Sequence, residues 1–128
     1  KLFLLTAFNY LVGNEDMHLK NFSVLTRDDV ASLSPAYDLV STSLVLRDPE
    51  EFALPLRGKQ RRLTREDIVD YFGRERLEIP ERDIETILGK VSTVRPEWHA
   101  LIGRSFLPEE YRQRLEELIA SRWKILMG

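Results

Sequence analysis

The first twelve residues carry apolar side chains on almost every side of a helix. These side chains occupy positions 2, 3, 4, 5, 7, 8, 11 and 12. A helix that is apolar all round is usually buried, so we predict a buried helix over residues 1–12. Gly13 follows, and glycine suits the position just past a helix C-terminus because it reaches left-handed backbone angles without strain. The helix is therefore expected to end there.

Short apolar runs replace the helical spacing after this point. Residues 22–25 predict a strand, residues 27–29 a turn, and residues 30–33 a second strand that returns antiparallel to the first. Such a hairpin would bring Asp38 back toward Asn21, which precedes the first strand. Two segments that are separated in the chain would then contribute to one site.

The middle of the chain shows no single period. Residues 39–57 are mixed in character, with Pro49 and Pro55 as breakers of regular structure. Within this region, residues 52–56 are expected to be extended.

Helical spacing dominates the second half of the chain. A helix is expected to begin at Thr64, a favourable N-cap residue, and to end at Gly73. Pro80 and Pro108 each open a further helix, because proline is tolerated in the first turn. A separate helix is expected over residues 96–103. The expected fold class is mainly α, a helical bundle with one small β-hairpin.

Composition places the chain among ordinary globular domains. Its 128 residues are 43% hydrophobic and 31% charged, which indicates one domain with its own core. The net charge of −2 excludes a global attraction to nucleic acid, so any such contact needs a local patch. The chain has no cysteine, which removes disulfides, thiolate catalysis and zinc–thiolate sites and fits a reducing cytoplasm. The apolar run in residues 2–12 is interrupted by Thr6 and Asn9, so no membrane span is expected.

Three oxygen-bearing side chains suggest phosphoryl transfer. Asp16 is followed five residues later by Asn21, and Asp38 comes after the expected hairpin. Phosphoryl transfer needs a carboxylate that orients the attacking hydroxyl and oxygen ligands that hold Mg²⁺ on the phosphates. We assign the first role to Asp16 and the metal-binding role to Asn21 and Asp38. Lys20 could approach the γ-phosphate and offset its charge, or could simply be solvated.

The spacing of these residues matches a protein-kinase catalytic loop only in part. Asn14-Glu15 stands where such kinases have His-Arg, and Leu-Val follows Asp38 in place of Phe-Gly. An ordinary eukaryotic-type kinase is therefore not expected. Small-molecule kinases of the aminoglycoside or choline type share the spacing, but they usually have histidine at the position of Asn14.

A longer set of positions resembles the C-terminal lobe of the HipA family, bacterial serine/threonine-protein kinase toxins of toxin–antitoxin systems. The matching positions are Asn14, Asp16, His18, Lys20, Asn21, Phe22, Ser23 and residues 33–39, 54–59 and 63–67. The resemblance spans roughly the first half of the chain. It implies a kinase-like C-lobe over residues 1–128, with ATP and Mg²⁺ as cofactors and His18 close to the nucleotide. Tyr37 either packs on the nucleotide side or belongs to the core, and we favour the core.

The same resemblance implies partners and a missing lobe. The targets of the family are protein components of translation, such as aminoacyl-tRNA synthetases. In its complexes a helix-turn-helix antitoxin holds the kinase beside operator DNA. The chain starts inside an apolar helix without an initiator Met, so we expect a fragment. It also has no Gly-rich phosphate loop and no strand lysine of the kinase N-terminal lobe. The 128-residue chain alone is therefore expected to be inactive.

A local basic cluster has two interpretations. Its members are Arg57, Lys59, Arg61, Arg62 and Arg65. They could bind phosphate groups of nucleic acid or of a phosphorylated segment. They could equally form ion pairs with Asp67 and Asp70 at a solvated helix start. If the cluster docks on DNA or on an antitoxin, the whole chain could be a non-catalytic interaction module.

Overall fold

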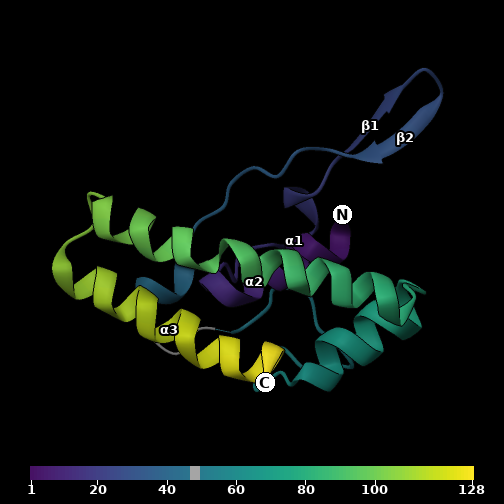
Figure 1. The fold of residues 1–128 in the computed structure, drawn as a ribbon. Helices are drawn as coiled ribbons and strands as arrows, with labels where there is room; N and C mark the ends of the chain where they lie inside the picture. Colours follow the sequence, from purple (N-terminus) through teal and green to yellow (C-terminus); the bar gives the residue numbers. More distant parts are fainter. Residues whose placement is uncertain (47–49) are drawn as a thin grey trace.

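The computed structural model describes residues 1–46 and 50–128, so Pro49 lies outside the described residues. Its elements, in chain order, are α1 (Leu2–Val12), η1 (Leu19–Asn21), β1 (Val24–Arg27), β2 (Val30–Leu33), η2 (Thr42–Leu44), η3 (Glu66–Arg76), α2 (Glu81–Arg104) and α3 (Glu109–Met127). Helices α2 and α3 run side by side in opposite directions, and the hairpin projects away from them (Figure 1). The prediction of a mainly helical fold with one small hairpin is confirmed.

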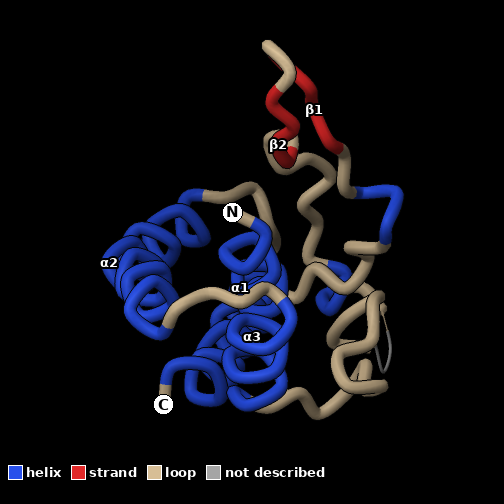
Figure 2. The backbone as a smooth tube through the Cα atoms, turned by 90° about the vertical axis from the view of Figure 1, so that its right-hand side faces the viewer, coloured by secondary structure: helices blue, strands red, loops and turns tan. Residues whose placement is uncertain are grey.

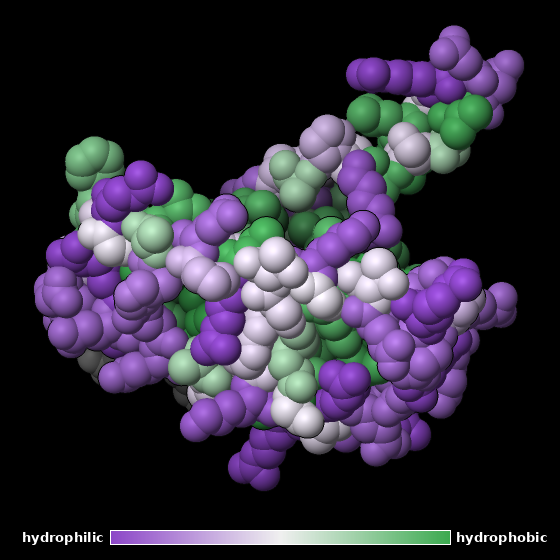
Figure 3. Space-filling model, viewed as in Figure 1, coloured by the Kyte–Doolittle hydropathy of each residue, from purple (hydrophilic) through white to green (hydrophobic). Residues whose placement is uncertain are grey.

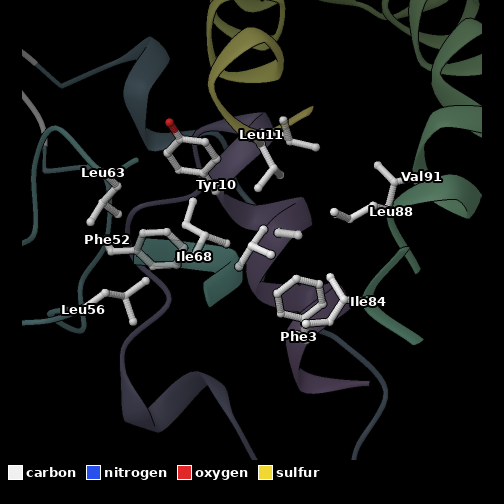
Figure 4. Packing of buried hydrophobic residues seen from close by; sticks show 13 residues of the cluster. Phe3, Tyr10, Leu11, Phe52, Leu56, Leu63, Ile68, Ile84, Leu88 and Val91 are labelled. Carbon is white, nitrogen blue, oxygen red and sulfur yellow. The ribbon is translucent and has the colours of Figure 1, made fainter. Parts of the chain in front are cut away.

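Helix α1 lies at the centre of the bundle because its apolar side chains leave no polar face. It contacts α2, α3 and η3, and Figure 2 shows α1, α2 and α3 gathered beneath the hairpin. Phe3, Tyr10 and Leu11 are fully buried and point toward side chains from the later elements (Figure 4). The Tyr10 ring stacks on Phe52, with ring centroids 6.1 Å apart. This packing fixes the end of α1, from which the candidate site continues.

Gly13 ends α1 as predicted. Its φ of 73° is left-handed, and its N–H bonds to the carbonyl groups of Asn9 and Tyr10. A side chain here would also meet Leu118 and Ser43, because a Cβ atom would lie 2.6 Å from Leu118 Cδ2 and from Ser43 Oγ. Both the backbone angle and the lack of space therefore require glycine.

The hairpin forms with one small shift from the prediction. The first strand occupies Val24–Arg27 rather than residues 22–25, and it pairs antiparallel with β2 over Val30–Leu33. Asp28 and Asp29 both have positive φ, 49° and 61°, as a two-residue turn of type I′ requires. Apart from Leu33, which is half-buried, both strands are exposed. Figure 3 shows the hairpin standing clear of the body.

Residues 52–56 do not form the extended segment that was predicted. Within the described residues, Leu56 pairs only with Lys59, in a single bridge across a tight turn. Phe52 and Leu56 are buried, and the bridge satisfies the Leu56 carbonyl oxygen, which accepts the Lys59 N–H at 2.8 Å, but not the carbonyl groups of Phe52 and Ala53. The Gln60 side chain donates to the carbonyl groups of Phe52 and Ala53 instead, at 3.2 and 2.8 Å.

The helix after Thr64 runs past the predicted end. Thr64 and Asp67 exchange hydrogen bonds between main chain and side chain, as in a capping box. Helix η3, which is of π type, continues through Gly73 to Arg76. Gly73 is buried, and a Cβ atom there would lie 3.0 Å from Phe3 and Ile84. It therefore serves close packing rather than helix termination, and the predicted end was wrong.

Pro80 and Pro108 stand directly before α2 and α3, as predicted. The separate helix over residues 96–103 was wrong, because α2 continues through Pro96 without a break. Proline removes one helical hydrogen bond, and the contact with α3 holds the helix together across this point. Trp98 packs edge to face on Trp123 of α3, with ring centroids 6.4 Å apart.

None of the described helices has both the length and the apolar character needed to cross a membrane.

Candidate functional site

The loop between α1 and β1 brings Asp16, His18 and Asn21 together. The Asn21 side-chain amide donates to the Asp16 carbonyl oxygen at 2.7 Å, and the His18 main-chain N–H donates to the same oxygen at 2.9 Å. The Asp16 carboxylate is left facing solvent, with 64% of its side chain exposed. His18 Nε2 lies 3.7 Å from Asp16 Oδ1. A compact turn therefore presents a solvent-facing carboxylate beside an amide and an imidazole.

The chain beyond the hairpin returns to this loop through Tyr37. The Tyr37 hydroxyl donates to the Lys20 carbonyl oxygen at 3.1 Å, and Ser23 Oγ lies 3.2 Å from the same hydroxyl. Ser34 joins the group, because its Oγ lies 3.1 Å from Ser23 Oγ. Tyr37 is 41% exposed, so its favoured assignment to the core was wrong. Its ring stays at the surface because its hydroxyl joins the two segments.

Asp38 follows Tyr37 directly and is therefore carried to the same side of the loop. Its φ of 53° is left-handed, a conformation that Asp and Asn adopt more readily than other non-glycine residues. Its side chain is exposed, as is that of Lys20. The main chain next to Asp38 is thus held against the residue that precedes Asn21.

Asn21 and Asp38 carry side-chain oxygen atoms of the kind that a hard cation could use as ligands. Asn21 uses its amide nitrogen to bind the Asp16 carbonyl, which leaves the amide oxygen as a ligand. Together with the Asp38 carboxylate it offers the oxygen donors that Mg²⁺ prefers. Among residues 1–46 and 50–128, no three His, Asp or Glu side chains converge into a ready-made metal site. Any cation here would need ligands from a substrate as well.

Two hollows adjoin the loop. One, of about 310 Å³, is lined by His18, Leu19, Lys20 and Leu54. The other, of about 290 Å³, is almost entirely apolar and lies between α1, the loop and residues 52–56, with Phe22 in its wall. The exposed face of the loop is therefore open to a ligand.

The underside of the loop is held by residues that were not among the predicted site residues. Asn14 is 1% exposed and donates to the Asn9 side chain at 3.1 Å. Glu15 is buried as well, and Arg122 from α3 pairs with it at 3.0 Å. A signal for Arg122 existed, since it falls on the apolar stripe of α3, four residues after Leu118 and four before Leu126. An arginine in such a stripe needs a buried partner.

The basic cluster is largely occupied by internal partners. Arg57 pairs with Glu66 at 2.7 Å, and this hydrogen bond raises the pKa of Arg57. Lys59 lies 3.0 Å from Asp67, whose side chain is 1% exposed. Burial acts to raise the pKa of Asp67, but hydrogen bonds from Thr64 and Lys59 outweigh it and leave the pKa below its ordinary value.

Arg65, a further member of the cluster, donates to the Leu126 carbonyl oxygen. Arg61 is also engaged in an interaction. Arg62 is exposed, in left-handed geometry with a φ of 53°. These contacts favour the interpretation as a paired helix start over an open phosphate-binding patch.

Comparison with known proteins gives one matching family model and two similar proteins. A family model described as the HipA-like C-terminal domain matches residues 1–98, which include Asp16, Asn21 and Asp38. The chain is similar to two Sinorhizobium fredii proteins, named putative kinase Y4dM and putative kinase Y4mE. It is 47% identical to the first over 49 residues, 38% of this chain and 12% of that protein. It is 50% identical to the second over 42 residues, 33% of this chain and 10% of that protein. The chain thus matches about a tenth of the length of these curated relatives.

Proposed function

Because this chain belongs to the HipA-like C-terminal domain family, we propose that it is the catalytic lobe of a serine/threonine-protein kinase, which transfers the γ-phosphoryl group of ATP to a protein hydroxyl. The family is one of kinases, which implies ATP as the phosphoryl donor. The observation that supports the proposal most is the hydrogen bond from Tyr37 to the Lys20 carbonyl oxygen, at 3.1 Å. It joins the segment of Asp38 to the loop of Asp16 and Asn21.

Each side chain of the loop has a role that its position suits. The exposed Asp16 carboxylate orients the substrate hydroxyl and accepts its proton late in the transfer. Asn21 and Asp38 would hold Mg²⁺ through their side-chain oxygen atoms. Lys20 lies beside them and offsets charge on the γ-phosphoryl group. His18 and Tyr37 border the nucleotide.

Bound Mg·ATP supplies the phosphoryl group and the cation that neutralises its oxygens. The protein contributes position: the Asn21 amide is tied to the Asp16 main chain, so the proposed ligand and the proposed base move together. A fixed spacing between these two residues suits a reaction class in which catalysis is mainly positioning and electrostatic stabilisation.

The 128-residue chain by itself is expected to bind Mg·ATP weakly or not at all. It contains no Gly-rich phosphate loop and no strand lysine for the α- and β-phosphates. We propose that a separate N-terminal lobe of the full-length polypeptide carries them. Isothermal titration of this chain with Mg·ATP checks the expectation, and a micromolar affinity would contradict it.

The test of the catalytic assignment uses the full-length polypeptide that carries this sequence. Asp16→Asn should lower ATP consumption and phosphate transfer to protein about a hundredfold or more, because the hydroxyl loses its base. The matched control is Asp29→Asn in the hairpin turn, where asparagine tolerates the φ of 61°. Unchanged activity in Asp16→Asn would remove Asp16 from its role. Transfer to an aminoglycoside or choline rather than to protein would instead indicate a small-molecule kinase.

Partners follow only from the family and are part of the proposal. We expect a protein substrate in the cytoplasm, such as an aminoacyl-tRNA synthetase, and a helix-turn-helix antitoxin. DNA contact beside the antitoxin would use the cluster of Arg57, Lys59, Arg61 and Arg62. Reversing charge at Arg61 and Arg62 should weaken the antitoxin–DNA complex if the cluster takes part. The internal ion pairs of Arg57 and Lys59 argue for a minor contribution.

A further inference from the structure

We propose that Glu15 and Arg122 form a buried clamp that holds the loop of Asp16 in position against the segment that follows Asp38. This inference rests on the proposed function, since it makes Arg122 of α3 a positioning residue for the kinase site. Glu15 immediately precedes Asp16, and 107 residues separate it from Arg122. The clamp therefore joins the C-terminal helix to the proposed catalytic loop.

The Glu15 carboxylate collects contacts from three directions. Arg122 Nη2 donates to Oε1 at 3.0 Å, and the Ser43 hydroxyl donates to the same oxygen. Thr42 Oγ1 lies 3.4 Å from Oε2 and accepts the Glu15 main-chain N–H at 3.0 Å. Thr42 and Ser43 belong to η2, which begins four residues after Asp38. Glu15 therefore joins the loop that carries the proposed base to the segment that follows the proposed metal ligand Asp38.

Main-chain contacts reinforce the same junction. The Ser43 N–H donates to the Gly13 carbonyl oxygen at 3.1 Å, and Thr42 Oγ1 lies 3.3 Å from that oxygen. Gly13 is the residue at which α1 ends and the loop begins. The position of η2 is therefore fixed relative to the start of the loop as well as to Glu15.

Arg122 closes the clamp from the side of α3. Its Nη1 donates to the Tyr10 carbonyl oxygen at 2.6 Å, and its guanidinium carbon lies 5.1 Å from the Tyr10 ring centroid. Its Nη2 also approaches Ser43 Oγ, at 3.4 Å. A planar guanidinium can bind a helix end, a carboxylate and a hydroxyl at once, which lysine cannot do. One side chain thus connects α1, the loop and η2.

Burial makes the two charges depend on each other. The side chains of Arg122 and Glu15 are 8% and 4% exposed. A buried carboxylate whose partner is removed takes up a proton, gains water or moves toward solvent. Each of these responses weakens the contacts of Glu15 with η2, so loss of Arg122 should loosen Glu15 and the adjacent Asp16. The clamp also keeps the underside of the loop neutral, so that Asp16 and Asp38 do not face a third uncompensated carboxylate.

The family match does not extend to this helix. It ends at residue 98, whereas α3 begins at Glu109. The contacts of Arg122 nevertheless place it directly beneath the loop. We therefore expect α3 to be required for the geometry of the site and not only for the stability of the bundle.

The first test is hydrogen exchange of main-chain amides in this chain. Arg122→Met keeps the apolar stem and removes the charge, and Lys124→Met at an exposed position of α3 is the matched control. We expect exchange in residues 13–22 and 41–44 to rise about tenfold or more in Arg122→Met, with α2 unaffected. Arg122→Lys should show more protection than Arg122→Met, because lysine keeps the positive charge although it lacks the planar guanidinium group with its several N–H donors. Unchanged exchange in the loop would overturn the clamp.

A double variant keeps the test decisive if Arg122→Met does not fold. Glu15→Met with Arg122→Met removes both charges, and apolar replacement of a buried pair is generally tolerated. We expect it to fold and still to lose protection in the loop, because the carboxylate that binds η2 is gone. A folded double variant with a fully protected loop would overturn the proposal.

The second test measures catalysis in the full-length polypeptide. The double variant should lower kcat about tenfold to a hundredfold with little change in the KM for ATP, since a misplaced base slows transfer without removing nucleotide contacts. Lys124→Met should leave both parameters unchanged. If the wild-type protein transfers no phosphate, the proposed function fails while hydrogen exchange still decides whether the clamp exists. If the wild type is active and the folded double variant matches its kcat, the clamp is overturned and the proposed function stands.

Discussion

Replacing Gly13 by alanine should disturb the point from which the loop starts. Gly13 has a φ of 73°, and neighbouring side chains leave no room for a methyl group at this position. A Cβ atom would lie 2.6 Å from Ser43 Oγ, 2.8 Å from Ser43 Cβ and 2.6 Å from Leu118 Cδ2. The Leu118 methyl group and the Ser43 hydroxyl can rotate away, but Ser43 Cβ is attached directly to the main chain of η2, so η2 itself has to shift.

Two contributions to the free energy of unfolding can be separated. An L-residue in left-handed geometry costs roughly 1–2 kcal/mol. Forcing a methyl group into a packed site costs a further 1–3 kcal/mol or so. Gly13→Ala should therefore lower the free energy of unfolding by about 2–5 kcal/mol, a large share of the roughly 5–15 kcal/mol of a typical domain.

Gly58 provides the matched control. Its φ of 75° is nearly the same, but a Cβ atom there would meet nothing within 4 Å. Gly58→Ala should therefore show only the backbone cost of roughly 1–2 kcal/mol. Urea unfolding followed by tryptophan fluorescence measures both variants, provided that the slopes of the transitions agree. Equal losses in the two variants would refute the reasoning, because the steric contribution at Gly13 would then be absent.

Three further predictions concern helix propensity and protonation. Gly89→Ala should raise the free energy of unfolding by roughly 0.5–1 kcal/mol in thermal melts followed by circular dichroism, since residue 89 is exposed in α2 and a Cβ atom there meets nothing within 4 Å. Because the pKa of Asp67 lies below its ordinary 3.8, the ionised side chain contributes fully to the free energy of unfolding above about that pH, and this contribution is lost as the pH falls further. Asp67→Asn should remove this part of the acid dependence of unfolding. Burial, assisted by the charge of Glu51, raises the pKa of Tyr10 from 10.0 to about 12. The protonated side chain therefore contributes fully to the free energy of unfolding below pH 10, and this contribution is lost as the pH rises through 12. Absorbance titration of the phenolate and alkaline unfolding of Tyr10→Phe check this.

Local signals predicted the elements whose ends are set by single residues. Gly13 ends α1, and Pro80 and Pro108 precede α2 and α3, because backbone geometry alone determines these positions. Pro96 and Gly73 misled for the opposite reason. Each is a helix breaker in isolation, yet contacts with other elements keep α2 and η3 continuous there. Such contacts come from segments far away in the chain and leave no mark in the neighbouring residues.

The same distinction applies to the candidate site. Asp16 and Asn21 lie in one loop, so their spacing was sufficient to associate them, and the hairpin correctly predicted that the segment near Asp38 returns to the loop. The pairing of Glu15 with Arg122 could not be predicted in this way. Nothing near either residue indicates which of the many opposite charges will be its partner, since that choice depends on how α3 packs against α1.

The projecting hairpin has a consequence for handling the protein in solution. Both strands of a two-stranded sheet are edge strands, so each copy presents unpaired main-chain groups along two sides. Val24 and Val30 are each 66% exposed on these strands, which favours edge-to-edge aggregation at high concentration. Charged residues protect only the tip, where Arg27 is followed by Asp28 and Asp29. The solubility of this chain should therefore depend more strongly on protein concentration than its ordinary composition suggests.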